Sequence, residues 1–216
     1  VGVEIKKLRA TGKIVVTSMG DVAASGGYWL AACTDKIYAN STTMTGSIGV
    51  YVPYANWEEL YKKVGIYQEK IKSGPHKDIL SPERTMTSEE REIIQLMVDD
   101  IYDQFVTVVA QGRNMDIDQV RKLADGRIYT GNQAKQLGLV DELGNMYDAI
   151  DGAAQLAGIS GKPEIKEYGK YSPWSMLFGA NEQVGSLLEK IIFNQAKNAL
   201  NMGVTQELSP AKWQVK

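Results

Sequence analysis

The sequence has little of the material from which several kinds of site are built. It holds one cysteine, Cys33, and one histidine, His76. An internal disulfide framework is therefore excluded, and a zinc site built from His and Cys has too few ligands. No run of 18 or more apolar residues occurs, so the sequence contains no candidate transmembrane helix. The net charge is only −2 and no basic block is present, so we expect no nucleic-acid partner.

Phosphate-binding and dinucleotide-binding loops are missing as well. None of the 21 glycines belongs to a Gly-x-x-x-x-Gly-Lys-Ser/Thr loop, and no dinucleotide fingerprint follows the first predicted strand. We therefore expect neither a cofactor nor a bound metal. What is present is an ordinary globular composition, with 44% hydrophobic residues among 216, enough for one core of sizeable extent.

Predicted strands and helices alternate along the chain, which indicates an α/β architecture with much parallel pairing. Strands are predicted at residues 14–17, 35–39, 48–52, 66–71 and 163–168. Helices are predicted at residues 25–33, 57–64, 87–111, 116–126, 131–137 and 147–156, the third of them opened by a capping box from Thr87 to Glu90. Its residues Ile93, Met97, Ile101, Phe105, Val108 and Val109 form one apolar face. This helix is predicted to be the longest of the domain.

The two ends of the chain differ in character from the rest. Residues 3–8 read as the end of an amphipathic helix that Gly12 stops, so we expect the chain to be a fragment with a missing upstream strand or anchor. A break at residues 172–174 predicts two parts, a domain over residues 1–171 and a C-terminal helical extension over residues 172–216. The apolar stripe at residues 182–202 could pack on the domain, on another subunit or on a lipid surface.

The stretch Gly-Asp-Val-Ala-Ala-Ser-Gly-Gly-Tyr, from Gly20 to Tyr28, places a serine where a strand turns into a helix. Ser25 begins that helix, and its small neighbours let another backbone approach. The amides of Gly26 and Gly27 lie in the first helical turn, where they lack intrahelical partners and can bind an anion. A hydroxyl beside an anion site suits acyl transfer, although an ordinary helix N-cap at Ser25 has the same pattern.

A serine nucleophile needs a base, and one loop offers two candidates, His76 and Lys77. For His76, the nearest acidic residue that could orient the ring is Asp78. A lysine has an ordinary pKa of ~10.4 and serves as a base only when burial favours the neutral amine. The hydroxyls at residues 43–47 are suited to orient such an amine. The ordinary alternative for Lys77 is a surface lysine in a polar loop.

Five motifs occur in order along the chain: residues 21–28, 45–50, 72–78, 125–134 and 139–144. Together they resemble the signal peptide peptidase A family, the S49 serine peptidases, and the likeness covers about residues 6–159. The resemblance implies a Clp protease/crotonase-like α/β fold with a mostly parallel sheet and flanking helices. It also implies a Ser-Lys catalytic dyad.

The roles of single residues follow from this resemblance. Ser25 matches the nucleophile, and Lys77 matches the general base. Ser47 matches the residue that hydrogen-bonds the lysine, and the amide of Gly26 gives half of the oxyanion hole. The family's other oxyanion donor lies in a Pro-Gly-Gly segment before a helix like residues 1–8, and neither that segment nor the family's membrane anchor occurs in this sequence.

The resemblance implies a serine endopeptidase that degrades remnant signal peptides, or other extended hydrophobic peptides, at a bacterial or archaeal cell membrane. The peptidase domain is expected outside the cytoplasm, with membrane attachment through a segment absent from this chain. Small residues around Ser25 favour a modest apolar pocket, and the peptide is expected to bind as an added strand. A homo-oligomer is also expected, since family members assemble into dome-like rings.

Three alternatives stay open at this point. In the first, His76 replaces Lys77 as the base and lies within hydrogen-bond reach of Ser25. In the second, the chain is a catalytically inactive membrane scaffold built on a peptidase domain. In the third, the fold serves a crotonase-type acyl-CoA enzyme, which needs backbone amides and carboxylates but no Ser-Lys dyad.

Overall fold

The computed structural model describes residues 1–168 and divides the chain into two compact units, residues 1–163 and 164–216. The first unit holds every helix and strand of the described residues. The strand predicted at residues 163–168 is wrong, because no part of this stretch forms a ladder. The predicted C-terminal helical extension lies outside the described residues.

Helices and strands alternate through the first unit, which confirms the predicted α/β class. The strands are β1 (Val16–Met19), β2 (Val22–Ala24), β3 (Lys36–Ala39), β4 (Met44–Gly46), β5 (Ile128–Thr130) and β6 (Glu142–Leu143). The helices are α1 (Gly2–Ala10), α2 (Gly26–Ala31), α3 (Glu58–Lys63), α4 (Ser88–Arg113), α5 (Ile117–Leu123), α6 (Gly131–Gln136) and α7 (Met146–Leu156). Within the described residues, no helix has both the length and the apolarity needed to cross a membrane.

Two small sheets organise the unit. In the first, the order is β1-β3-β6 and both pairings are parallel. In the second, the order is β2-β4-β5, with β2 parallel and β5 antiparallel to β4. The pairing of β2 with β4 sets Ala24 opposite Gly46, so the residues that follow these two strands emerge side by side.

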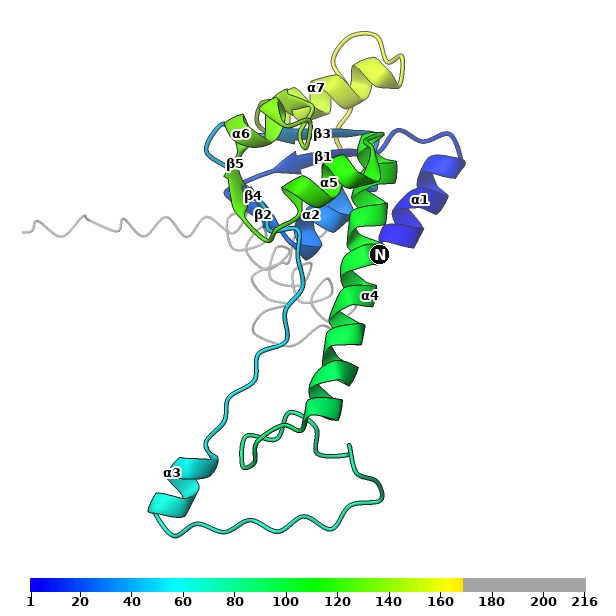
Figure 1. Ribbon diagram of the computed structural model, residues 1–216. Coiled ribbons are helices and arrows are strands. Elements are labelled where there is room, and N and C mark those ends of the chain that lie inside the picture. Colours follow the sequence, from blue (N-terminus) through cyan, green and yellow to red (C-terminus); the bar gives the residue numbers. More distant parts are fainter. Residues whose placement is uncertain (169–216) are drawn as a thin grey trace, which may run out of the picture. The chain divides into compact units, whose positions relative to one another are not determined.

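The apolar core lies between these sheets and the helices that flank them (Figure 1). Its largest fully buried apolar side chains include Tyr28, Met19 and Ile37. Close helix packing depends on a glycine: a Cβ on Gly112 of α4 would overlap the carbonyl oxygen of Ala32 at the end of α2. We call residues 1–48 and 105–163, which contain all of this core, the head.

Residues 49–104 form a second region, which we call the arm. It consists of an extended segment, α3, a long connection and the first part of α4, which carries the chain back to the head (Figure 1). No apolar side chain of the arm is buried, and its single buried residue is Glu90, which is 2% exposed. The capping box is confirmed: Thr87 Oγ1 accepts from the Glu90 amide, and the Glu90 carboxylate accepts from the Thr87 amide.

Three predictions fail in or near the arm. Residues 48–52 and 66–71 are not strands, because no neighbouring chain segment pairs with them. The predicted apolar face of α4 is buried only where it reaches the head, at Phe105 and Val109. Ile93, Met97 and Ile101 are 40%, 44% and 39% exposed. The sequence of the arm thus has the apolar periodicity of packed strands and helices, but no described segment of the chain buries its apolar side chains.

Candidate active site

The backbone of Ser25 lies at the junction between β2 and α2 in a conformation that L-residues rarely adopt. Its φ is 52° and its ψ is −118°, and such a conformation costs about 1–3 kcal/mol. The amide of Ser25 donates to the carbonyl of Gly46 at 2.8 Å, which ties the strained residue to β4. Although Ser25 occupies the N-cap position, its side chain makes no capping hydrogen bond. The predicted N-cap position is therefore confirmed, but Ser25 does not cap through its side chain, and its exposed hydroxyl forms no hydrogen bond with the described residues.

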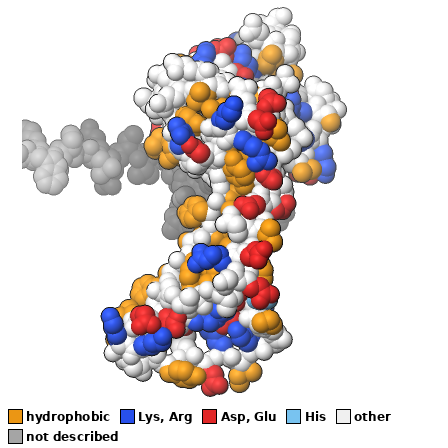
Figure 2. Space-filling model, viewed as in Figure 1, with side chains coloured by type: hydrophobic (Ala, Val, Ile, Leu, Met, Phe, Trp, Pro, Cys, Tyr) orange, Lys and Arg blue, Asp and Glu red, His pale blue; other side chains and the backbone are white. Residues whose placement is uncertain are grey.

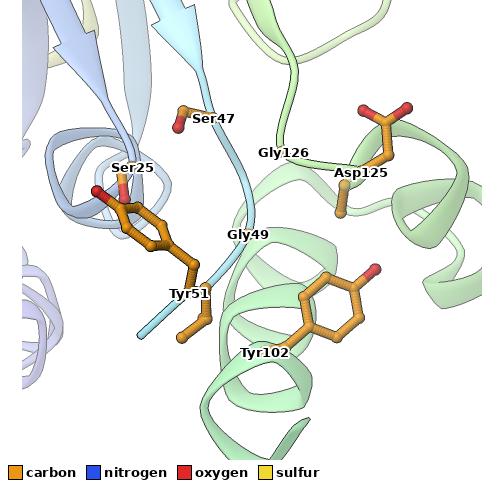
Figure 3. Close-up of a pocket in the computed structure, with 9 residues that line it drawn as sticks. Ser25, Ser47, Gly49, Tyr51, Tyr102, Asp125 and Gly126 are labelled. Atoms are coloured by element: carbon orange, nitrogen blue, oxygen red, sulfur yellow. The ribbon is translucent and has the colours of Figure 1, made fainter. Parts of the chain in front are cut away.

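A cavity of about 460 Å³ opens beside this serine. Its walls include Ser25, Ser47, Tyr51 and Tyr102 (Figure 3). Ser47 follows β4 and also has a positive φ, 50°. Because β2 and β4 are parallel neighbours, the two serines leave the same end of the sheet. The structure thus brings together two residues that lie 22 positions apart (47 − 25) and that the sequence analysis selected.

The first turn of α2 presents backbone amides to this region. The N–H groups of Gly26 and Gly27 lie in the first turn of the helix and have no intrahelical acceptor. A Cβ built on Gly26 would meet no atom within 4 Å. Packing inside the chain therefore does not require a glycine at this position. The open space allows a ligand oxygen to approach the Gly26 amide, as an oxyanion site requires.

Close backbone contact shapes the cavity on the side opposite Ser25. The amide of Gly126 donates to the carbonyl of Ile48 at 3.1 Å. A Cβ on Gly49 would lie 3.2 Å from the Cα of Gly126, so a larger residue at 49 would push these segments apart. The cavity is therefore assembled from residues distant in the sequence, including Asp125 next to Gly126.

Asp125 is the carboxylate of the cavity wall. Its Oδ1 accepts from Nε of Arg127 at 2.8 Å, and the guanidinium holds the pKa of Asp125 below its usual range. A carboxylate that is ionised and paired is a weak proton acceptor. Asp125 is therefore a poor candidate for the base that Ser25 needs. Its pairing with Arg127 also does not favour the acyl-CoA alternative, which needs an available carboxylate.

Lys77 does not line the cavity that contains Ser25. It is exposed and lies in a turn of the arm, where its amide donates to the carbonyl of Gly74 at 3.3 Å. The next residue, Asp78, is joined through Arg84 to Glu90 in the first turn of α4. Glu90 and the cavity residue Tyr102 are 12 positions apart on this helix (102 − 90), or about 18 Å along its axis.

Four charged residues hold the turn that contains Lys77, and we call them the Arg84 clasp: Lys72, Asp78, Arg84 and Glu90. Arg84 donates to both carboxylate oxygens of Asp78, at 2.8 and 3.0 Å, and to both oxygens of Glu90. Lys72 donates to Asp78 at 2.6 Å. The Arg84 guanidinium lowers the pKa of Glu90 to about 2 and the pKa of Asp78 far below its usual value.

His76 also belongs to the arm. Its Nε2 lies 3.6 Å from Glu89. Its Nδ1 lies 3.8 Å from Glu90 and has no hydrogen-bond partner among residues 1–168. The ring does not line the cavity beside Ser25. Within one chain, the predicted contact between His76 and Ser25 is therefore wrong, because the ring packs against the start of α4 instead.

The cavity is also lined by the side chains of Tyr51, Tyr102 and Asp125, none of which was a predicted site residue (Figure 3). Asp125 lies in one of the five motifs, which was a usable signal. Tyr102 lies one turn before the buried Phe105 on α4 and could have been placed near the core by helical spacing. Among residues 1–168 no cluster of His, Cys, Asp and Glu could hold a metal ion.

Comparison with known proteins covers most of the chain. The profile of Peptidase family S49 matches residues 7–160. A Synechocystis protein whose name assigns it to the proteases is 44% identical over 201 residues, which cover 92% of this chain and 68% of the relative. An Enterococcus faecium protein named as a signal peptide peptidase is 47% identical over 148 residues, which cover 68% of this chain and 43% of the relative.

A plant protein extends the comparison beyond bacteria. The chloroplast serine protease SPPA of Arabidopsis thaliana is 40% identical over 72% of this chain, and the match covers 23% of the relative. The chain thus spans less than half the length of the Enterococcus and Arabidopsis relatives.

Proposed function

The chain belongs to peptidase family S49, a family of serine peptidases, and from this premise we propose that it is an endopeptidase with Ser25 as nucleophile. Its proposed substrates are extended hydrophobic peptides, among them the remnants of cleaved signal peptides, in line with the name of the Enterococcus relative. We propose that it acts at a cell membrane and that its two small sheets belong to the Clp protease/crotonase-like folds.

The strained backbone of Ser25 is the observation that carries this proposal. A residue with φ 52° between a strand and a helix projects its hydroxyl out of the turn, as nucleophile elbows do. The hydroxyl caps no helix and borders a cavity with Ser47. Strain of this kind persists where the surroundings impose it, and it is concentrated at functional sites.

We propose that the base for Ser25 is Lys77 from a second copy of the chain. Within one copy, the Arg84 clasp fixes the turn of Lys77 near the start of α4, about 18 Å along the helix from Tyr102, farther than a lysine side chain reaches. An exposed Lys77 on an arm can instead enter the cavity of a neighbouring head. Burial there would favour the neutral amine that a base requires.

The proposed reaction uses four groups. The neutral amine of Lys77 takes the proton of Ser25, and Oγ attacks the peptide carbonyl. The Gly26 amide donates to the oxyanion, while Ser47 orients the amine of Lys77. The Lys77 ammonium then protonates the leaving amine, and an acyl-enzyme remains. Water attacks this ester with Lys77 again as base, which releases the acid and restores Ser25.

The backbone next to the cavity supports binding of an extended peptide. Residues 49–55 make no backbone hydrogen bond with any other described residue, so their N–H and C=O groups can pair with a ligand. Along this segment Val50, Val52 and Tyr54 are half-buried, whereas Tyr51 and Pro53 are exposed. This alternation is typical of an extended strand with one buried face. Its unpaired backbone groups are free to pair with an added peptide strand.

Two variants of the chain test whether two copies share one site. Ser25→Ala and Lys77→Ala should each lose nearly all peptidase activity, while His76→Ala keeps it. When the first two variants are assembled together, up to about a quarter of wild-type activity should return, because random pairing joins an intact Ser25 and an intact Lys77 in one site of four.

Other outcomes would contradict particular parts of the proposal. A mixture that stays inactive would show that Ser25 and Lys77 must come from the same copy. Loss of activity in His76→Ala with retention in Lys77→Ala would favour the histidine base. A serine-directed fluorophosphonate that leaves wild-type Ser25 unlabelled would favour the inactive scaffold.

A further inference from the structure

A second cavity continues from the one beside Ser25 along α4. It has a volume of about 310 Å³ and shares Val50 and Tyr51 with the first cavity. Its walls are mostly apolar and include Val52, Leu80 and Ile94. The extended segment at residues 49–55 thus borders both cavities, so a peptide that pairs with this segment passes from one to the other.

Two polar side chains line this apolar cavity, Arg91 and Gln95 of α4, besides the tyrosine hydroxyls. The amide nitrogen of Gln95 donates to Asp99 at 2.8 Å, which leaves its carbonyl oxygen available. Arg91 is exposed, and its guanidinium forms no ion pair or hydrogen bond with the described part of the chain, although its backbone amide donates to Thr87 within the helix. The positive charge on the wall of the cavity is therefore not neutralised by any described carboxylate.

Arg91 differs in this respect from the other arginines of the chain. Arg9, Arg84, Arg113, Arg121 and Arg127 each pair with an aspartate or glutamate. Arginine matches carboxylates because its planar guanidinium donates two parallel hydrogen bonds. An arginine without such a partner, on an apolar wall beside a candidate active site, favours a carboxylate supplied by a ligand.

The position of Arg91 on α4 sets the spacing. Arg91 and Tyr102 are 11 positions apart (102 − 91), or about 17 Å along the helix. An extended peptide advances about 3.3 Å per residue, so about five residues span this distance. A carboxylate that reaches Arg91 would therefore lie about five residues from the bond that Ser25 attacks.

We propose that the cavity at Arg91 is a substrate subsite that binds a carboxylate about five residues from the scissile bond, with the apolar side chains between them on the cavity wall. This inference rests on the proposed peptidase function of Ser25. The carboxylate comes either from the free C-terminus of a short peptide or from a glutamate or aspartate side chain within a longer one. In both cases Arg91 selects peptides by charge at a fixed distance from the cleavage point.

The experiment compares four peptides that share one cleavable hydrophobic core. Two end five residues after the scissile bond, with a free C-terminal carboxylate or with a carboxamide. The other two are longer and have blocked ends. One carries glutamate five residues from the scissile bond on each side, and the other carries glutamine at the same positions. We expect kcat/KM to be about tenfold higher for the carboxylate member of at least one pair, since an arginine–carboxylate contact is charge-assisted.

Variants of the protein then assign the effect. Arg91→Gln should remove the preference, Arg91→Lys should retain part of it, and Glu92→Gln should retain all of it as the control for a charge change at an exposed neighbour. A preference in the first pair alone identifies the C-terminus as the ligand, and one in the second pair alone identifies a side chain.

Equal cleavage of all four peptides by the wild type, or an unchanged preference in Arg91→Gln, would overturn the inference and leave the proposed function intact. Failure of the proposed function has a different signature, since Ser25→Ala would then cleave the peptides as fast as the wild type. The two failures are therefore distinguishable in one set of assays.

Discussion

The head and the arm are held together by different forces. The head buries Tyr28, Met19, Ile37 and the rest of the apolar core, whereas the arm buries only the carboxylate residue Glu90. Basic and acidic side chains gather at the far end of the arm (Figure 2). Apolar burial is strong and needs no exact partner geometry, while a buried carboxylate depends on its guanidinium.

This difference matches the division of the proposed site. Ser25, Ser47 and the Gly26 amide lie in the head, where the sheets and the core impose their geometry. Lys77 lies in the arm, where the Arg84 clasp fixes the turn but no apolar core supports it. The proposed nucleophile is thus preformed within one copy, whereas placement of the proposed base would depend on charge pairs and on a neighbouring chain.

A pair of glycine substitutions should give the largest contrast in stability between the two regions. In Gly112→Ala the new methyl group overlaps the carbonyl oxygen of Ala32, so α4 must move away from α2. We expect a loss of about 3 kcal/mol in the free energy of unfolding, or roughly 10 °C in Tm. Thermal and denaturant unfolding measure it.

Gly74→Ala is the matched control in the arm, since a Cβ there meets no atom within 4 Å. Its free energy of unfolding should stay within about 0.5 kcal/mol of the wild type. A comparable loss in the free energy of unfolding in both variants would mean that the arm is packed as tightly as the head, which would contradict the prediction.

Removal of the Arg84 guanidinium should have a smaller effect on global stability but a clear effect on activity. In Arg84→Met, Glu90 and Asp78 lose their main hydrogen-bond donor. We expect peptidase activity to fall about 10- to 100-fold, because the turn of Lys77 loses its fixed position. Hydrogen exchange should increase at residues 72–90 and remain unchanged in the head.

An exposed charge pair in the arm provides the control. Lys62 pairs with Glu58 and Glu59 at the surface, and such pairs contribute little to stability. Lys62→Met should therefore leave activity and hydrogen exchange at residues 72–90 unchanged. An equal loss of activity in Lys62→Met would show that charge removal anywhere in the arm suffices.

The smallest effect on the stability of the arm should come from lowering the pH. The pKa of Glu90 is lowered to about 2, and the pKa of Asp78 is also depressed. Their ordinary values in unfolded chains are ~4.3 and ~3.9. The stabilisation from both carboxylates is thus complete above those values and is lost as the pH falls from about 4 towards 2.

Pepsin cleaves proteins at acidic pH, so it can show whether the arm opens before the head as the pH falls. Cleavage within residues 72–90 should begin below about pH 4, while a fragment that contains the head persists. Arg84→Met should be cut there at higher pH as well, because the carboxylates have lost the cation that lowers their pKa. Simultaneous cleavage of head and arm in the wild type would contradict the prediction.

Local chemistry explains which parts of the structure were predictable. The capping box of Thr87 and Glu90 and the cap at Asp116 mark helix starts through contacts within three residues. The strand-to-helix turn at Ser25 was predictable for the same reason, because small residues follow a β-branched run. These signals do not depend on any distant segment.

The remaining features depend on long-range partners. Residues 48–52 have the pattern of a strand, yet a strand forms only where a second segment pairs with it. The left-handed backbone of Ser25 depends on its hydrogen bond to Gly46, which no local pattern reveals. Lys77 was chosen by resemblance, but the fold of one copy sets it apart from Ser25, and only the three-dimensional path of the arm revealed that separation.

Helix α4 connects the two regions as a lever. From Phe105, its first buried apolar residue, back to Ser88 the helix runs about 26 Å. A tilt of about 10° at the head would move the other end by about 4 Å, more than the length of a hydrogen bond. Small changes in packing around Gly112 are therefore amplified before they reach Lys77, and we expect substitutions deep in the head to alter catalysis without touching either member of the proposed dyad.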